Sequence, residues 1–85
     1  MKTIVASVGH GGLNRTEDVR LVQELLNRHL QPPQHPLVVD GMMSPRTIAA
    51  IAAFQRRVLN IHRPDGHIQP GDCTMAALTR QLAMC

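Results

Sequence analysis

Hydrophobic residues recur at helical spacing in three segments of the chain. Between Arg15 and Leu30, one stripe is formed by Val19, Val22, Leu26 and Leu30, and it is widened by Leu21 and Leu25. Apolar residues three and four positions apart share a face of an α-helix, so the pattern predicts an amphipathic helix. Two further helices are expected, from Ser44 to about Asn60 and from Asp72 to about Ala83. Their inward-facing residues are Ile48, Ile51, Phe54, Val58 and Leu59 in the second helix, and Thr74, Met75, Ala77, Leu78 and Leu82 in the third.

Polar residues and prolines mark the ends of these helices. Asn14 is expected to cap the first helix, with Glu17 completing a capping box. Ser44 followed by Pro45 predicts the start of the second helix, and Asp72 predicts the start of the third. Three prolines must end the first helix, because proline cannot continue a helix interior: Pro32, Pro33 and Pro36.

The sequence therefore predicts an all-α fold, a small three-helix bundle with long turn-rich connections. Residues 3–8 favour extended structure, and we expect them to form a short N-terminal arm that covers the core. Residues 1–85 are expected to form a single domain, with the arm and a loop in 1–13 and the three-helix core in 14–84.

One phrase occurs twice in the chain, in 40–51 and in 65–78. Each copy has an Asp-Gly pair, three residues, a proline, a short spacer, and then Thr-x-Ala-Ala followed by Ile or Leu. Asp-Gly favours a tight turn, because glycine accepts a positive φ and aspartate bonds its own local backbone. The phrase thus describes a turn that leads into a helix, and two copies in so short a chain indicate a small helical domain whose Asp-Gly turns serve a purpose.

Composition narrows the function classes only a little. The formal net charge is +3, and the nine Lys and Arg residues are spread along the chain without a basic run. This spread favours a solvated surface over a nucleic-acid-binding arm. A helix-turn-helix is disfavoured as well, because the predicted connections are long and proline-rich.

Cysteine and N-terminal patterns give expectations about bonding and location. If one helix carried Cys73 and Cys85, their Cα atoms would lie ~18 Å apart, too far for an intrachain disulfide. Free thiols are expected, with an intermolecular disulfide through Cys85 as the alternative. The apolar stretch in residues 3–8 is too short for a signal peptide, and no segment reaches transmembrane length. We expect synthesis in the cytoplasm and, for action outside, export by a non-classical route.

Several phrases in order resemble the peptidoglycan-binding domain family, whose members are three-helix cell-wall binding modules. The phrases are Asp18-Val19-x-x-Val22-Gln23-x-Leu25-Leu26-Asn27, then Val39-Asp40-Gly41 with Pro45-x-Thr47, and Ala50-Ile51-x-x-Phe54-Gln55. There are two departures: Ser44 stands where the family has a second glycine, and Met43 stands where an aromatic is common. Residues 7–14 and 64–71 look like a subgroup associated with phage-like and type VI secretion effectors.

The resemblance implies non-catalytic binding of peptidoglycan in the periplasm or at the cell wall. The ligand would be the stem peptide, held in a shallow groove between the first two helices and the Asp40–Thr47 turn. A cell-wall hydrolase or a secretion-system protein would be the partner brought to the wall. The ligand-binding residues implied are Asp40, Gly41, Arg46, Thr47, Asn27 and Asp65.

Each of these residues also has a structural interpretation that the sequence leaves open. Asp40 and Asp65 would accept hydrogen bonds from a stem amine, or would serve only as turn formers and caps. Arg46 would pair with a stem carboxylate near free helix N–H groups, or would be solvated. Thr47 would pack at the helix start more readily than contact ligand. Gln23 and Gln55 are expected to bond the backbone of a neighbouring loop.

Other functions are less well supported. The alternative to peptidoglycan binding is a protein-protein interaction adaptor that uses Met42, Met43 and Met75 as an adaptable apolar surface. His62, His67 and Cys73 lack the paired spacing of a zinc site, so no metal and no cofactor are expected. No activated nucleophile with a base is recognisable, and an enzyme, a nucleic-acid ligand and membrane insertion are not expected.

Overall fold

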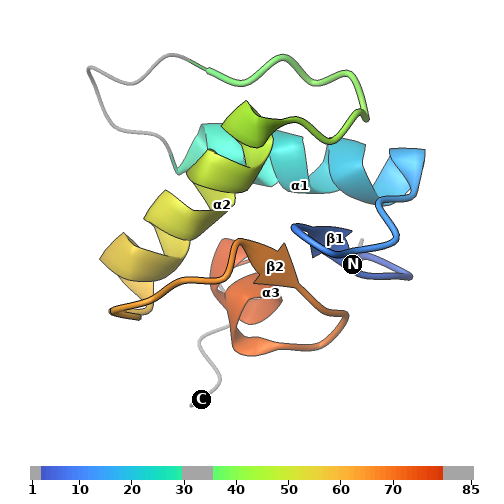
Figure 1. Ribbon diagram of the computed structural model, residues 1–85. Helices are drawn as coiled ribbons and strands as arrows, with labels where there is room; N and C mark the ends of the chain where they lie inside the picture. The colour runs from blue at the N-terminus through green and yellow to red at the C-terminus, as the bar shows by residue number, and fades with distance from the viewer. Residues whose placement is uncertain (1–2, 30–35, 80–85) are drawn as a thin grey trace.

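The computed structural model describes residues 3–29 and 36–79, and it contains three helices and a two-stranded sheet (Figure 1). The helices are α1 (Thr16–Arg28), α2 (Pro45–Val58) and α3 (Cys73–Leu78). The strands β1 (Val8–Gly9) and β2 (His67–Ile68) pair antiparallel, with Val8 opposite Ile68 and Gly9 opposite His67.

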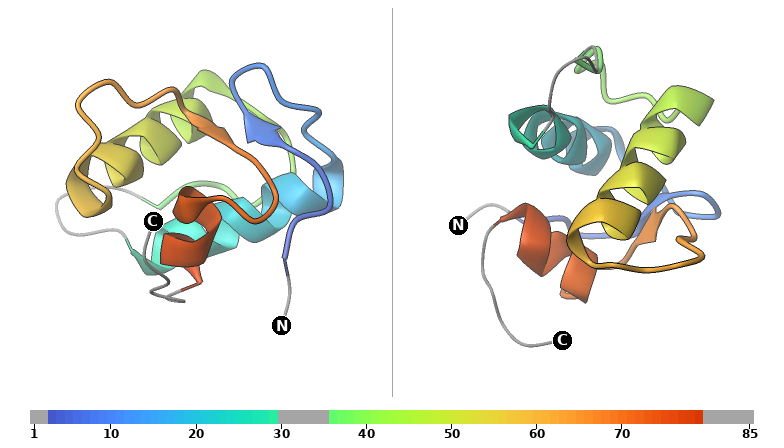
Figure 2. Two further views of the ribbon diagram at one scale, coloured as in Figure 1. Left: turned by 90° about the horizontal axis from the view of Figure 1, so that it is seen from below. Right: turned by 90° about the vertical axis from the view of Figure 1, so that its left-hand side faces the viewer.

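The sheet brings the segment before α1 beside the segment before α3. Figures 1 and 2 show the two strands side by side, although they lie near opposite ends of the chain. Helix α1 packs against α2, α3 and β1, and α2 packs against both strands. The mostly helical fold with three helices was predicted, but its arrangement as a simple bundle is not confirmed. The sheet was missed because no second strand that could pair with the extended arm was recognised in the sequence.

Side-chain caps begin the second and third helices, as predicted. The Oγ of Ser44 accepts the Thr47 N–H at 3.2 Å, and Pro45 is the first residue of α2. The Oδ1 of Asp72 accepts the Met75 N–H at 3.0 Å at the start of α3. Each cap satisfies a backbone donor that has no partner within its own helix.

The predicted cap of the first helix is wrong. The N-cap position of α1 is Arg15, whose side chain makes no capping bond, and Asn14 instead has a φ of +55°. The Asn14 side chain accepts the Gly9 N–H at 2.7 Å and donates to the carbonyls of Gly9 and Gly12. Asparagine tolerates the left-handed region, so its amide closes this loop in place of capping the helix.

The core lies between the helices and the sheet. Most of the predicted inward residues are buried: Val19, Val22, Leu25 and Leu26 of α1, Ile51 and Phe54 of α2, and Thr74, Met75 and Leu78 of α3. Four others are only partly buried, namely Leu21, Ile48, Leu59 and Ala77, and Val58 is 45% exposed at the end of α2. Leu30 and Leu82 lie outside the described residues. The full apolar core is Ile4, Val8, Val19, Val22, Leu25, Leu26, Leu37, Ile51, Phe54, Ile68, Met75 and Leu78.

The N-terminal arm covers this core, as predicted. Ile4 and Val8 are buried, and the carboxyl group of Asp18 accepts the backbone N–H groups of Val5 and Ala6, each at 3.0 Å. Asp18 is itself buried, so α1 holds the arm through two backbone hydrogen bonds as well as through apolar contact.

The expectation of free thiols is wrong for Cys73, which is disulfide-bonded. The expectation assumed one helix reaching to about Ala83, but α3 ends at Leu78. The second cysteine of the sequence, Cys85, lies outside the described residues.

Candidate functional site

The first Asp-Gly turn is held by the side chain of Gln23. The Gln23 Oε1 accepts the N–H groups of Asp40 and Gly41, at 3.1 and 2.9 Å. The Gln23 Nε2 donates to Asp40 Oδ1, to the Met42 carbonyl and to Thr47 Oγ1, at 3.2, 3.1 and 3.2 Å. One buried carboxamide on α1 therefore holds the turn and the first turn of α2 together.

Gln55 holds the second Asp-Gly turn in the same way. Its Oε1 accepts the Gly66 N–H at 3.0 Å. Its Nε2 donates to Asp65 Oδ1, to the His67 carbonyl and to Thr74 Oγ1, at 3.2, 3.2 and 3.1 Å. The structural role expected for the two glutamines is confirmed in both copies.

The two glycines make equivalent close approaches. A Cβ added to Gly41 would lie 2.6 Å from Thr16 Cγ2, and one added to Gly66 would lie 2.9 Å from Ile48 Cγ2. Both glycines have positive φ, +74° and +65°. Thr16 and Ile48 each precede by seven residues the glutamine that holds the turn, so turn, glycine contact and glutamine form one repeated unit.

Hydrogen bonds lower the pKa of both turn aspartates below the ordinary value of 3.8. For Asp40 the main cause is the Met42 N–H, at 2.9 Å from Oδ1, followed by the Gln23 amide. Burial raises the pKa of Asp65, but the donors from the His67 backbone and Gln55 together outweigh it. Both groups are therefore carboxylates at neutral pH.

The other predicted ligand residues differ in how far they are engaged inside the protein. Asn27 is bonded twice to the backbone of Leu37, accepting its N–H at 2.8 Å and donating to its carbonyl at 3.0 Å. Thr47 is buried against Gln23. Arg46 is exposed in the first turn of α2, and within the described ranges it makes no hydrogen bond or ion pair.

The structure thus brings Asp40, Gly41 and Thr47 together around Gln23 and places Arg46 next to them in α2. Asp65 belongs to the separate cluster around Gln55. In both clusters a single carboxylate oxygen, Oδ1, accepts the hydrogen bonds of the turn, and Oδ2 has no donor among residues 3–29 and 36–79.

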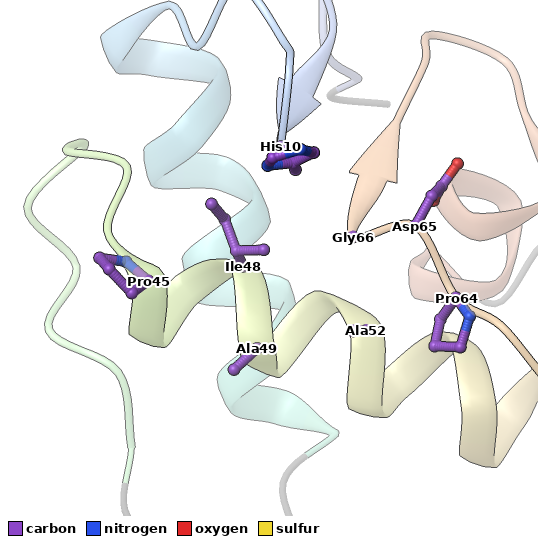
Figure 3. A pocket seen from close by; sticks show the side chains of 8 residues that line it. All are labelled: His10, Pro45, Ile48, Ala49, Ala52, Pro64, Asp65 and Gly66. Atoms are coloured by element: carbon purple, nitrogen blue, oxygen red, sulfur yellow. The ribbon is translucent and has the colours of Figure 1, made fainter.

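A pocket of about 320 Å³ lies beside the second unit. Pro45, Ile48, Ala49 and Ala52 of α2 form one wall, and His10 and the segment 64–66 form the other (Figure 3). The His10 ring and the Ile48 side chain lie toward each other, whereas the Asp65 carboxylate points away from α2.

Most of this lining was missed from the sequence. Asp65 was the predicted site residue that contributes to it; His10, Ala49 and Ala52 carried no signal, because small and loop residues gain a role only once β1 and β2 pair. The pairing is reinforced by a contact of 2.9 Å between the His67 Nδ1 and the His10 carbonyl.

The described part of the chain contains neither a metal-binding cluster nor a membrane-spanning helix. Across residues 3–29 and 36–79, no three His, Cys, Asp or Glu side chains group in a way that fits a metal ion. Within the same ranges, none of the helices combines the length and the apolarity that a bilayer crossing requires.

Comparison with known proteins gives one family. The model of the peptidoglycan binding domain matches residues 15–78, about three quarters of the 85-residue chain. Neither the curated proteins nor the solved structures gave a significant match. The matched range begins before α1 and ends with α3, so it contains both glutamine-held turns. The chain belongs to the peptidoglycan-binding domain family.

Proposed function

We propose that this domain binds the stem peptide of peptidoglycan without catalysing a reaction. The proposed binding surface lies along the end of α1, the 40–47 turn and the start of α2. The observation that carries the proposal is the Asp40 carboxylate, fixed through Oδ1 by Gln23 and Met42 while its Oδ2 has no donor among the described residues.

The fixed carboxylate suits one of the charged groups of a stem peptide. A stem amine can donate to Asp40 Oδ2 without disturbing the bonds that hold the turn. Because the glutamine cluster already fixes the carboxylate, binding requires little ordering of the protein.

Arg46 suits the opposite charge. Its guanidinium is exposed and unpaired within the described ranges, and α2 has no acidic residue in its first turn. A stem carboxylate would therefore meet an available two-pronged donor and the positive end of a helix. A small open site of this kind should bind with micromolar to millimolar affinity, about 4–8 kcal/mol, and many sites on one polymer would compensate.

The use of such a module is targeting. We infer that it holds a partner, a cell-wall hydrolase or a secreted effector, at the wall, which requires passage to the periplasm or the cell surface. The family match supports the family but not the type VI secretion subgroup. That subgroup rests on the phrases in 7–14 and 64–71 alone.

Co-sedimentation with purified insoluble peptidoglycan tests the proposal. Wild type should sediment with the polymer, and Arg46→Ala and Asp40→Asn should remain mostly in the supernatant. Asp40→Asn is preferable to Asp40→Ala, since the asparagine Oδ1 still accepts from Met42 and Gln23 while the charge is lost. Arg56→Ala, an exposed change in the last turn of α2, should sediment like wild type. Wild type that stays in the supernatant would refute peptidoglycan binding.

One observation supports the adaptor alternative. Val38 and Met42 are 72% and 68% exposed on the loop before α2, and Val39 is partly exposed beside them. Met75, which the alternative also requires, is buried in the core and cannot contribute. Loss of partner capture by Val38→Ser and Met42→Ser variants that still sediment with peptidoglycan would favour an adaptor surface distinct from the groove.

A further inference from the structure

Helix α3 is too short to be stable without contacts to the rest of the chain. It spans six residues, whereas isolated helices shorter than about 12–15 residues are marginal in water. Both of its ends are held from outside. Gln55 donates to Thr74 Oγ1 at 3.1 Å near the start, and the His29 ring contacts the Leu78 carbonyl at 3.0 Å at the end. A further bond at the start of α3 would therefore help to decide whether the helix stays in place.

The first residue of α3, Cys73, has such a bond, because it forms a disulfide. The sequence contains two cysteines, so within one chain the partner can only be Cys85. The distance that argued against this pair assumed one continuous helix. Since α3 ends at Leu78, Cys73 and Leu78 lie only ~7.5 Å apart along the helix axis. The segment from Leu78 to Cys85 can span up to ~25 Å, so its length allows a return to Cys73.

We propose that Cys73 and Cys85 form an intrachain disulfide that anchors α3 in an oxidising compartment. Cytosolic reductants keep thiols reduced, whereas disulfides persist in the periplasm and outside the cell. In the oxidised protein the bond fixes the residue between the Asp72 cap and Thr74. In the reduced protein α3 opens locally, and the second Asp-Gly turn loses the contact between Gln55 and Thr74. The domain then reaches its full stability only outside the reducing cytoplasm.

Formation of the bond is a thiol–disulfide exchange with an external oxidant. One cysteine thiolate attacks a sulfur of a disulfide donor, which is a thiol oxidoreductase or glutathione disulfide, and one donor thiolate leaves. The second cysteine thiolate then displaces the other donor thiolate from the mixed disulfide. Two protons and two electrons have passed from the two thiols to the donor, which is released in its reduced form.

The first unit contains no cysteine and therefore provides an internal comparison. Gln23 joins Thr47 to the Asp40 turn by bonds equivalent to those that Gln55 makes in the second unit. Reduction should act on α3 and leave the Asp40 turn in place. The inference does not rest on peptidoglycan binding, because α3 contributes no residue to the proposed binding surface.

Thiol labelling tests the bond and its dependence on the compartment. Wild type is directed to the bacterial periplasm by an added signal peptide, denatured without reductant and treated with iodoacetamide. It should take up no label, and mass spectrometry should find the peptides of Cys73 and Cys85 linked within a monomer. Wild type kept in the cytoplasm should be labelled at both cysteines. Label at both cysteines of the periplasmic protein, a covalent dimer, or the same bond in both compartments would overturn the proposal.

Hydrogen exchange of the native protein distinguishes a local anchor from a general effect. A disulfide that only restricts the unfolded chain slows the exchange of all globally protected amides by the same factor. We expect dithiothreitol to speed exchange at the Ala76 and Thr79 N–H groups of the α3 region at least about tenfold more than at the amides of α1 and α2. Equal factors in the three helices, or loss of all three helices together, would overturn the anchor.

Two variants complete the test. Cys85→Ser should show the exchange pattern of reduced wild type and should not respond further to dithiothreitol. Cys73→Ser should behave in the same way, because either change removes the same bond. Reduction of wild type should lower the thermal midpoint by roughly 10–25 °C, and the two variants should unfold at the midpoint of the reduced protein. A midpoint of oxidised wild type that equals that of either variant would contradict the inference.

Discussion

Replacement of Gln23 by methionine removes a hydrogen-bonding carboxamide and keeps a side chain of similar length. Gln23 is 1% exposed and makes five hydrogen bonds to the 40–47 segment. Methionine can fill the space but can neither accept the Asp40 and Gly41 N–H groups nor donate to Thr47. The turn would keep its apolar contacts and lose every bond that joins it to α1.

The expected loss follows from burial. The bonds to the Gly41 N–H and to Thr47 Oγ1 are buried, whereas the other three are partly buried and can be replaced by water. A buried donor left without a partner costs about 1–3 kcal/mol, which applies to the Gly41 N–H. Thr47 Oγ1 keeps its contact with Ser44 Oγ at 3.2 Å, so the lost bond there costs about 0.5–1.5 kcal/mol, and the predicted total is about 1.5–4.5 kcal/mol. A chain of this size has about 4–13 kcal/mol of total stability, so Gln23→Met should lose a large share of it.

Urea unfolding followed by far-UV circular dichroism measures this loss, since the chain has no Trp and no Tyr to report by fluorescence. Gln55→Met should cost a similar amount, because Gln55 is also buried and makes four equivalent bonds. Gln69→Met is the matched control: Gln69 is exposed, and the change should stay within about 0.5 kcal/mol. A loss below about 1 kcal/mol for Gln23→Met would refute the structural role.

Three further changes test the turns and caps by the same unfolding measurement. Gly66→Ala should lower the free energy of unfolding by about 2–3 kcal/mol, because the added Cβ would lie 2.9 Å from Ile48 Cγ2 at a φ of +65°. Gly71→Ala is its control: φ is +78° but no neighbour lies within 4 Å, so the loss should be only about 1 kcal/mol. The pKa values of Asp40 and Asp65 are lowered in the folded state, so the free energy of unfolding should be constant above about pH 5 and fall as the pH drops below 3.8. Asp40→Asn should make that fall less steep. An unchanged slope would contradict the assignment. Ser44→Ala should cost about 1 kcal/mol and shift the urea midpoint without changing the slope of the transition.

Local signals in the sequence predicted the helix starts at Ser44 and Asp72. A cap is decided by atoms three residues apart, so the sequence contains all the information that it needs. Asn14 shows where the same argument fails, since its side chain had competing partners in the loop five residues earlier. The glutamine roles were predicted on a different ground, since a glutamine on or beside an apolar stripe usually bonds the backbone of a neighbouring loop.

The pocket could not be predicted in this way. His10 and Gly66 meet only because β1 and β2 pair, and the His67–His10 contact joins residues that are 57 positions apart in the chain. Two-residue strands carry too short an alternation to be recognised in a sequence. The sheet, the pocket and the place of His10 in it therefore follow from tertiary packing that no local pattern encodes.

Helix α2 belongs to both units, which links the groove to the pocket. Its Thr47 is bonded by Gln23 of α1, while its own Gln55 holds the segment before α3. A rotation of α2 that opened one turn would strain the other, so the two surfaces on either side of its first turns are fixed together. Ligand contacts at Arg46 would then meet a preformed surface and lose little free energy to reorganisation. Weak binding by the isolated domain would reflect a small contact area, and many sites on one polymer would compensate.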